Sequence, residues 1–136
     1  MELIYSKKEP RLLLHIIHRV EDIVSERTDV VPEHCFIQMS AMKLPAGKTF
    51  KPHKHIVKDP PTMARAQESW AIIRGKVKCI LYDIDDTIIA EPILFAGDCS
   101  ITIMGGHNYE VLEDDSLIRE YKTGPYEGQA KDKVFI

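Results

Sequence analysis

Two histidines one residue apart, in a stretch closed by glycine at both ends, constrain this chain more than any other feature. The stretch runs from Gly47 to Gly75 and contains His53, His55 and, further on, Glu68. Side chains two positions apart on a strand point to the same face, so an extended segment presents both imidazoles together. Two imidazoles and a carboxylate are typical ligands of a divalent transition metal. The sequence therefore predicts a metal site that this stretch supplies in part.

A fourth ligand has to come from another part of the chain, and the candidate is His107, in the segment I-M-G-G-H-N-Y. The two preceding glycines let the backbone bend freely there. On the expected strand Glu68 shares a face with Trp70 and Ile72, and an unpaired carboxylate is costly to bury among such side chains. A cation opposite Glu68 removes that cost. Mixed histidine and carboxylate ligands suit Fe, Mn, Ni, Co or Zn, so the identity of the metal stays open.

Composition limits the class of protein. The length of 136 residues suits one domain with a proper core. The formal net charge is -3 and the charges are mixed, so no basic stripe predicts a nucleic-acid partner. No apolar run is long enough for a transmembrane helix, and the N-terminus lacks the order of a signal peptide. The cysteines, which show no CxxC spacing, are Cys35, Cys79 and Cys99. We therefore expect reduced thiols and a cytoplasmic protein.

From Cys35 onward, short runs of residues with strand character lie between turns that contain glycine or proline, and this pattern indicates a β protein. We expect strands at 36–44, 48–56, 67–74, 76–84, 87–95, 99–104 and 117–121. Polar and apolar residues alternate over 76–84, as in a half-buried hairpin. Pro52 predicts an edge or a bulge in its strand, and Pro92 interrupts another. Many short strands with regular punctuation indicate an antiparallel sandwich or barrel.

The two ends of the chain are less regular. The apolar residues of 12–20 fit one stripe of a helix. The segment is also rich in Leu, Ile and His, which suits a strand, and the β character of the rest of the chain favours the strand. The tail has no period and ends in the apolar pair Phe135 and Ile136, which we expect to dock on this barrel or on a neighbour's. We divide one domain into an N-terminal extension or edge strands (1–34), a barrel (35–122) and a tail (123–136).

The central stretch resembles the first motif of the cupin superfamily: glycine, five residues, H-x-H, a short gap, glutamate, six residues, glycine. Gly47 is followed by five residues and then His53, and Glu68 is followed by six residues and then Gly75, so both fixed spacings match. The gap between His55 and Glu68 holds twelve residues, where the common pattern has three or four. The extra length is similar to an enlarged loop, over 56–66, at the mouth of a barrel.

The second cupin motif (glycine, five residues, P-x-G-x-x-H, three residues, asparagine) is matched less fully. Gly97 opens it, and Gly105 takes the place of the motif glycine. Ile103 replaces the proline, His107 comes one residue early, and Val111 stands where the asparagine would be. The resemblance covers about residues 35–122. It implies an all-β fold, the double-stranded β-helix or jelly-roll barrel, with metal bound by His53, His55, Glu68 and His107.

Candidate substrate-binding residues follow from alternation along the expected strands. Lys51 shares the face of the two histidines and is either an anion-binding residue or a solvated lysine at the barrel mouth. Gln38 lies on the preceding strand and can line the cavity. Trp70 is expected in its apolar floor. Tyr109 offers a hydroxyl group, with a packed core tyrosine as the alternative.

Three functions fit these features. The first is a metal-dependent enzyme acting on a small, oxygen-rich substrate such as a sugar derivative or a keto acid, with isomerase, epimerase or dioxygenase chemistry. The second is a non-catalytic module that binds or senses a small molecule. The third is a structural barrel that acts through dimerisation. Cupins often pair through their sheets, so the resemblance implies a homodimer, to which the N-terminal segment or the tail could supply swapped strands. We expect a small-molecule ligand, no nucleic acid and no membrane.

Overall fold

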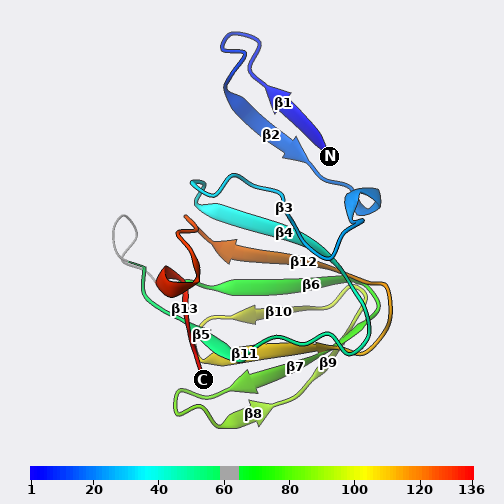
Figure 1. Ribbon diagram of the computed structural model, residues 1–136, viewed down its shortest axis with the longest axis vertical. Helices are drawn as coiled ribbons and strands as arrows, with labels where there is room; N and C mark the ends of the chain where they lie inside the picture. The colour runs from blue at the N-terminus through cyan, green and yellow to red at the C-terminus, as the bar shows by residue number, and fades with distance from the viewer. Residues whose placement is uncertain (59–64) are drawn as a thin grey trace.

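Two antiparallel β-sheets form the body of the molecule (Figure 1). The computed structural model describes residues 1–58 and 65–136, so residues 59–64 of the predicted loop lie outside the described residues. The five-stranded sheet has the order β10 (Cys99–Thr102), β6 (Glu68–Arg74), β12 (Ser116–Thr123), β4 (Ile37–Leu44) and β3 (Thr28–Asp29). The six-stranded sheet has the order β13 (Lys133–Phe135), β5 (His53–His55), β11 (Gly106–Val111), β7 (Lys76–Tyr82) and β8 (Ile88–Ala90), and β9 (Ile93–Phe95) also pairs with β7.

The rest of the described chain forms small elements. A separate hairpin of β1 (Glu2–Tyr5) and β2 (Leu13–Ile17) projects beyond β4 at the N-terminal end of the molecule (Figure 1). Single 3-10 turns, η1 (Val20–Asp22) and η2 (Gln129–Lys131), follow β2 and precede β13. No helix in the described part of the chain is long and apolar enough to cross a membrane. The all-β fold predicted from the sequence is confirmed.

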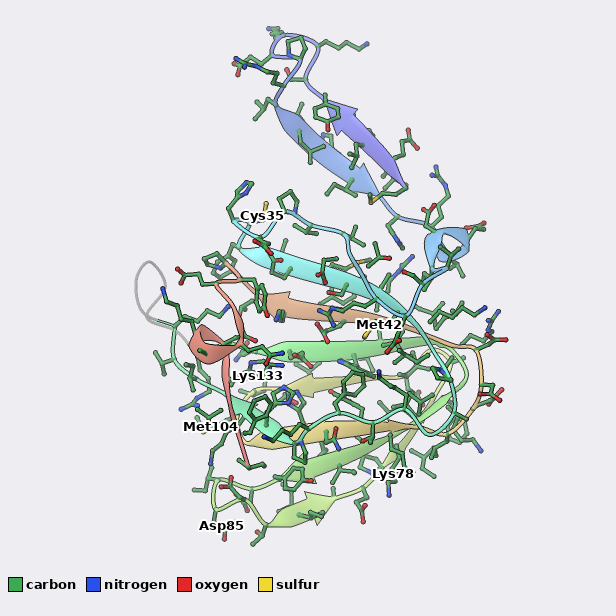
Figure 2. All side chains as sticks on the ribbon, viewed as in Figure 1. Cys35, Met42, Lys78, Asp85, Met104 and Lys133 are labelled. Atoms are coloured by element: carbon green, nitrogen blue, oxygen red, sulfur yellow. The ribbon has the colours of Figure 1, made fainter. Side chains whose placement is uncertain are left out.

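The alternation of side chains along each strand builds one apolar core between the sheets (Figure 2). Within it the rings of Trp70 and Tyr109 stack, with centroids 3.9 Å apart and planes 6° from parallel. Burying one large apolar side chain stabilises a fold by about 1.5–3 kcal/mol, so this core contributes to holding the two sheets together. Its buried members are Met42, Leu44, Trp70, Ile72, Val77, Cys79, Tyr109, Val111 and Ile118.

A second apolar cluster covers the other face of the five-stranded sheet. Ile23 and Val30, from the N-terminal segment, pack against Ala41 of β4 and Leu117 of β12. Arg119, also on β12, donates a hydrogen bond from Nη2 to a backbone carbonyl oxygen of the same segment, at 2.9 Å. The N-terminal segment between the hairpin and β4 is therefore part of the packed body.

Most predicted strands are present, and the exceptions have a local cause. The prediction of one strand over 48–56 is wrong in its first half, because β5 begins only at His53, directly after Pro52. Before it, Thr49 forms a single bridge with Glu110, and the N–H of Phe50 donates to a side-chain oxygen of β11. The edge or bulge predicted at Pro52 is also wrong, since β5 is paired on both sides, with β13 and β11.

Both chain ends form strands. Over 12–20, the strand is confirmed as β2 and no helix forms. The prediction that 117–121 is the last strand is wrong, because β13 adds a strand to the six-stranded sheet by pairing with β5. The apolar end of the tail thus docks on its own barrel: the N–H of Ile136 donates to the carbonyl oxygen of Pro52, at 3.1 Å.

The motif glycine Gly75 is required where β6 turns into β7. Its φ is +93°, a conformation that residues with a Cβ atom rarely adopt. A Cβ atom there would lie 2.1 Å from Oγ of Ser116 on β12. Both restrictions leave glycine as the residue that lets the chain pass from β6, in the five-stranded sheet, to β7, in the six-stranded sheet.

Candidate metal centre

The four predicted metal ligands meet inside the barrel. His53 and His55 come from β5 and His107 from the adjacent β11, where it is paired with His53. Glu68 comes from β6, in the facing sheet. One donor atom from each residue can be chosen so that all lie within 4.8 Å of one another, and all four side chains are buried. Alternation on the strands puts these side chains on the inner faces, as the sequence predicted.

Glu68 is the centre of the hydrogen bonds in this cluster. Its two oxygens lie 3.1 Å from Nε2 of His55 and 3.1 Å from Nε2 of His107, and Nε1 of Trp70 donates to Oε1 at 3.2 Å. Burial by itself would raise the pKa of Glu68, but the hydrogen bonds with His107 and His55 outweigh it and hold the pKa well below its usual range. The carboxylate is therefore ionised.

Backbone carbonyls fix the orientation of two of the rings. Nδ1 of His53 lies 3.0 Å from the carbonyl oxygen of Lys51, and Nδ1 of His55 lies 3.1 Å from that of Asp132. A carbonyl oxygen only accepts hydrogen bonds, so each Nδ1 carries the proton and each Nε2 faces the cluster. This is the arrangement that orients histidine as a metal ligand. Nδ1 of His107 is buried without a hydrogen-bond partner among the described residues.

The charges of the cluster fit a divalent cation. Burial, followed by the neighbouring ammonium group of Lys133, lowers the pKa of His53 to about 4, so this ring is neutral near pH 7. At His55, Nε2 lies 3.1 Å from a carboxylate oxygen of Glu68. In a neutral ring that carries its proton on Nδ1, Nε2 and this oxygen would both be hydrogen-bond acceptors. Such a contact needs a proton or a metal cation between the two atoms. Three imidazole nitrogens and one carboxylate oxygen are a donor set for a transition metal.

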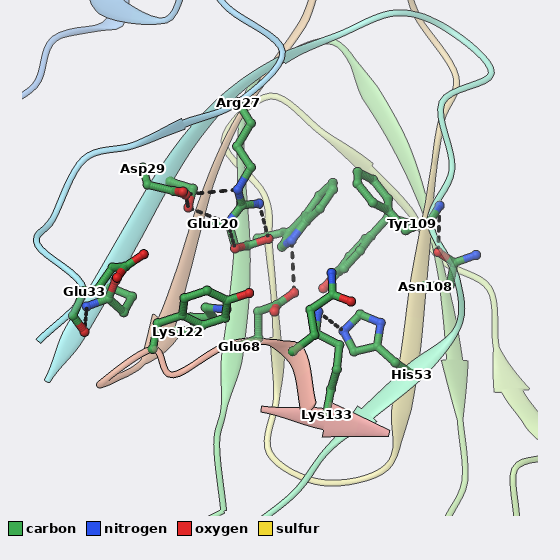
Figure 3. A pocket seen from close by; sticks show the side chains of 16 residues that line it. Arg27, Asp29, Glu33, His53, Glu68, Asn108, Tyr109, Glu120, Lys122 and Lys133 are labelled. Carbon is green, nitrogen blue, oxygen red and sulfur yellow. Dashed lines mark hydrogen bonds and ion pairs between the residues drawn. The ribbon is translucent and has the colours of Figure 1, made fainter. Parts of the chain in front are cut away.

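A cavity of about 300 Å³ lies against this cluster (Figure 3). His53 and Glu68 form part of its wall, so two of the four ligands face the open space. Of the four predicted substrate-binding residues, the structure places Gln38, Trp70 and Tyr109 in the cavity wall. Lys51 is exposed, and its ammonium group lies 4.3 Å from the centroid of the Phe135 ring rather than in that wall.

Two of these residues are already engaged in hydrogen bonds. The amide nitrogen of Gln38 donates to three backbone carbonyls before β4, at 2.8–3.3 Å. The hydroxyl group of Tyr109 bonds Oγ of Ser100 at 2.8 Å, and burial raises the pKa of Tyr109. Gln38 therefore shapes the cavity through the backbone, and Tyr109 presents a neutral ring to it.

An ion pair that the sequence analysis missed forms another part of the wall. Nη2 of Arg27 lies 2.8 Å from Oε1 of Glu120 and 2.6 Å from Oγ of Ser40, and Nε of the same guanidinium lies 3.0 Å from Asp29. Glu120 shares a face with buried Ile118 on β12, so the argument used for Glu68 would have placed it inside. Arg27, from the N-terminal segment, carries no such signal.

The tail supplies further residues that were missed. Asp132 is buried, with its carboxylate oxygens 3.2 Å from the ammonium groups of Lys58 and Lys122. Lys133 reaches the cavity wall, where its Nζ lies 3.1 Å from Nε2 of His53 (Figure 3). Asn108, next to His107, also lines the cavity and holds the segment before β5 through Phe50 and Thr49. Strand β13 has only three residues, too few to show a periodic pattern, so no pattern in the sequence marks Lys133.

Solved structures with the same architecture share little sequence with this chain. KdgF from Halomonas sp. is 19% identical, with a TM-score of 0.58 over 74% of this chain and 79% of that one. The capsular polysaccharide assembling protein CapF from Staphylococcus aureus is 16% identical, with a TM-score of 0.64 over 96% of this chain and 36% of that one. A variant of oxalate decarboxylase from Bacillus subtilis is 15% identical, with a TM-score of 0.57 over 74% and 24%.

These comparisons establish the fold. The chain spans most of KdgF but well under half of CapF and of oxalate decarboxylase. No protein-family model matches the sequence, and neither does any curated protein. The similar structures are cupins, and the motif spacings and the buried cluster agree with that fold. This chain has the cupin fold.

Proposed function

We propose that this protein is a metal-dependent cupin enzyme acting on a small, oxygen-rich substrate such as a sugar derivative or a keto acid. The observation that carries the proposal is the buried set of four donors beside a cavity of about 300 Å³. Structural metal sites are closed by their protein ligands, whereas catalytic sites keep a position open for substrate. A cluster whose members His53 and Glu68 face a cavity supports the catalytic kind.

Each part of the site has a role in this proposal. A divalent metal held by the four ligands would supply Lewis acid chemistry or bind dioxygen, which suits isomerase, epimerase or dioxygenase reactions. Trp70 and Tyr109 give the ligand an apolar wall that excludes water. The pair of Arg27 and Glu120 offers donors and acceptors for hydroxyl groups. Two of the similar structures, oxalate decarboxylase and the capsular polysaccharide assembling protein, are named for oxygen-rich compounds, which supports this class of substrate.

Metal analysis tests the proposal. We expect purified protein, or apo protein reconstituted with Fe, Mn, Ni, Co or Zn, to bind about one metal ion per chain. His55→Ala and Glu68→Ala should abolish this binding, and His34→Ala, at an exposed histidine, should not. Wild-type protein that takes up no metal under any of these conditions would overturn the proposal.

One observation favours a non-catalytic binding module as the second candidate. Two groups that could transfer protons in the cavity are engaged elsewhere: Glu120 with Arg27, and Tyr109 with Ser100. Thermal-shift screening of small organic acids and sugars separates the two candidates. Saturable binding without conversion of any bound compound favours the module, and conversion of one favours the enzyme.

The molecule also has features of a homodimer, which forms part of this proposal. Apolar side chains of the β1–β2 hairpin, including Leu3, Tyr5 and Leu14, are exposed, and an isolated two-stranded hairpin is marginally stable in water. An apolar groove of about 310 Å³, lined in part by Ile37 and Ile101, lies on the five-stranded sheet. A second copy of the chain would cover such surfaces. The three cysteines are unbonded, which supports a reducing compartment such as the cytoplasm.

A further inference from the structure

Lys133 differs from the other cations of the cavity wall in its partner. Arg27 is neutralised by Glu120 and Asp29, and Lys122 by Asp132. Among the described residues no carboxylate forms an ion pair with Lys133, whose Nζ instead donates to Nε2 of His53 at 3.1 Å. A half-buried ammonium group therefore faces the cavity with a neutral imidazole as its acceptor.

The contact with His53 is incompatible with the metal site. Nδ1 of His53 is committed to the carbonyl oxygen of Lys51, so Nε2 is the ring nitrogen left for a metal. A nitrogen has one lone pair, so Nε2 cannot both accept from Lys133 and bind a cation. When His53 serves as a metal ligand, Lys133 loses its acceptor, and an unpaired charge away from bulk water is unfavourable.

Other groups near Lys133 do not replace this acceptor. Asp132 precedes it on the tail but is shared between Lys58 and Lys122. Glu68 belongs to the cluster itself, and Glu120 is held by Arg27. Glu33, which also lines the cavity, is exposed at its edge. Adding a divalent cation beside Lys133 makes this side of the cavity more positive, so it favours an anion.

We propose that Lys133 binds the carboxylate of a small organic acid, placed beside the metal site, and that such acids are the substrate class. The inference rests on the proposed function, because it requires His53 to be a metal ligand. An uncharged sugar could accept a hydrogen bond from Lys133 but would leave its charge unneutralised. The short strand β13 then has a functional role: its pairing with β5 holds the lysine at the cavity wall.

The test uses protein loaded with Co²⁺, with glycolate as an anionic probe and glycolamide as its neutral counterpart. Trp70 is the only tryptophan and lines the cavity, so its fluorescence reports binding. Lys133→Met keeps the apolar stem and removes the charge. The matched control is Lys51→Met, at the exposed lysine outside the cavity wall. Lys133→Gln serves in its place if the methionine variant fails to fold.

We expect glycolate to bind wild-type protein and to bind Lys133→Met about tenfold more weakly or worse, the loss of one charge-assisted hydrogen bond. Glycolamide should bind weakly to both proteins, and Lys51→Met should resemble wild type. The absorbance of bound Co²⁺ gives a second readout. Lys133→Met should bind Co²⁺ at least as tightly as wild type, because a competitor for Nε2 of His53 has been removed.

The outcomes separate the two proposals. Co²⁺ binding with no glycolate binding, or with equal glycolate affinity in wild type and Lys133→Met, overturns the role of Lys133 and leaves the metal centre standing. Loss of glycolate binding in Lys51→Met alone also overturns it, in favour of Lys51. Failure of Co²⁺ and of the other metals to bind overturns the proposed function and this inference with it.

Discussion

Nε2 of His55 lies 3.1 Å from Oε2 of Glu68, across the space between the two sheets. Both side chains are almost completely buried, and β5 and β6 are not paired with each other. The contact therefore forms because the two sheets face each other in the folded barrel. It places an imidazole, already oriented by the carbonyl oxygen of Asp132, against an ionised carboxylate. The proposed metal site depends on that pair.

Replacing the carboxylate tests this dependence. Glu68→Gln keeps the shape of the side chain and removes its charge, so we expect the affinity for Zn²⁺ to fall by more than about a hundredfold, since residues that merely orient metal ligands contribute about 10–100-fold. Isothermal titration calorimetry measures the change. Glu113→Gln, at an exposed turn, is the control and should bind as wild type does. Equal Zn²⁺ affinity in all three proteins would contradict the assignment of Glu68 as a ligand.

Removing the metal should weaken the protein without unfolding it. None of the nine buried residues of the apolar core between the sheets is one of the four candidate ligands. Metal present at about a hundred times its dissociation constant adds about 2.7 kcal/mol to the free energy of unfolding. Chelation should therefore lower the melting temperature while the far-UV circular dichroism of a β protein is kept. Complete unfolding in the presence of chelator would show instead that the metal is structural.

The convergence of the four candidate ligands could be predicted from the sequence because the inward direction of each one depends on local alternation. His53 and His55 share a face wherever they are extended, and Glu68 shares one with Trp70. The spacings from Gly47 to His53 and from Glu68 to Gly75 then restricted where the turns before and after these strands could lie. Lys51 shows where this reasoning stops, because it assumed a strand running through Pro52. The strand begins after the proline, so Lys51 does not follow the alternation and is exposed.

The cations Lys133 and Arg27 of the cavity wall could not be predicted, for a different physical reason. Lys133 lies on β13, a three-residue strand that exists only by pairing with β5, about eighty positions earlier. Arg27 comes from an irregular segment and is fixed by Glu120 on β12. Such long-range contacts leave no periodic pattern in either partner. Glu120 is the exception, because its place beside Ile118 marks it as facing inward.

Two glycines provide a matched test of the turn between β6 and β7. Gly75 and Gly97 have φ of +93° and +96°, so alanine at either position meets the same backbone strain, roughly 1–2 kcal/mol. At Gly97 the added methyl group meets nothing within 4 Å, whereas at Gly75 it would meet Ser116. We expect Gly75→Ala to reduce the free energy of unfolding by about 1–3 kcal/mol more than Gly97→Ala does. Urea denaturation measures both, and equal losses would show that the contact with Ser116 relaxes freely.

The thiols should differ in reactivity. Burial raises the pKa of Cys79 to about 11, despite a hydrogen bond with Ser100 that lowers it. At pH 8 about one part in a thousand of this thiol is ionised, and the thiolate is the reactive form. Ellman's reagent should modify exposed Cys99 quickly in the native protein and Cys79 only after unfolding. Cys99→Ser should remove the fast phase. A fast phase retained in Cys99→Ser and lost in Cys79→Ser would contradict the burial of Cys79.

The exposed hairpin should decide the oligomeric state. Leu14 on β2 is 50% exposed, and a glutamate there would place a charge on the surface that we propose is covered by a second copy. Leu14→Glu should therefore convert a dimer into a monomer, because an unpaired buried charge destabilises an interface. Val24→Glu is the matched control: Val24 is apolar and 75% exposed but lies outside the hairpin. Sedimentation velocity over a range of protein concentrations distinguishes the states. A monomeric wild type, or a Leu14→Glu variant that stays dimeric, would exclude the hairpin as the interface.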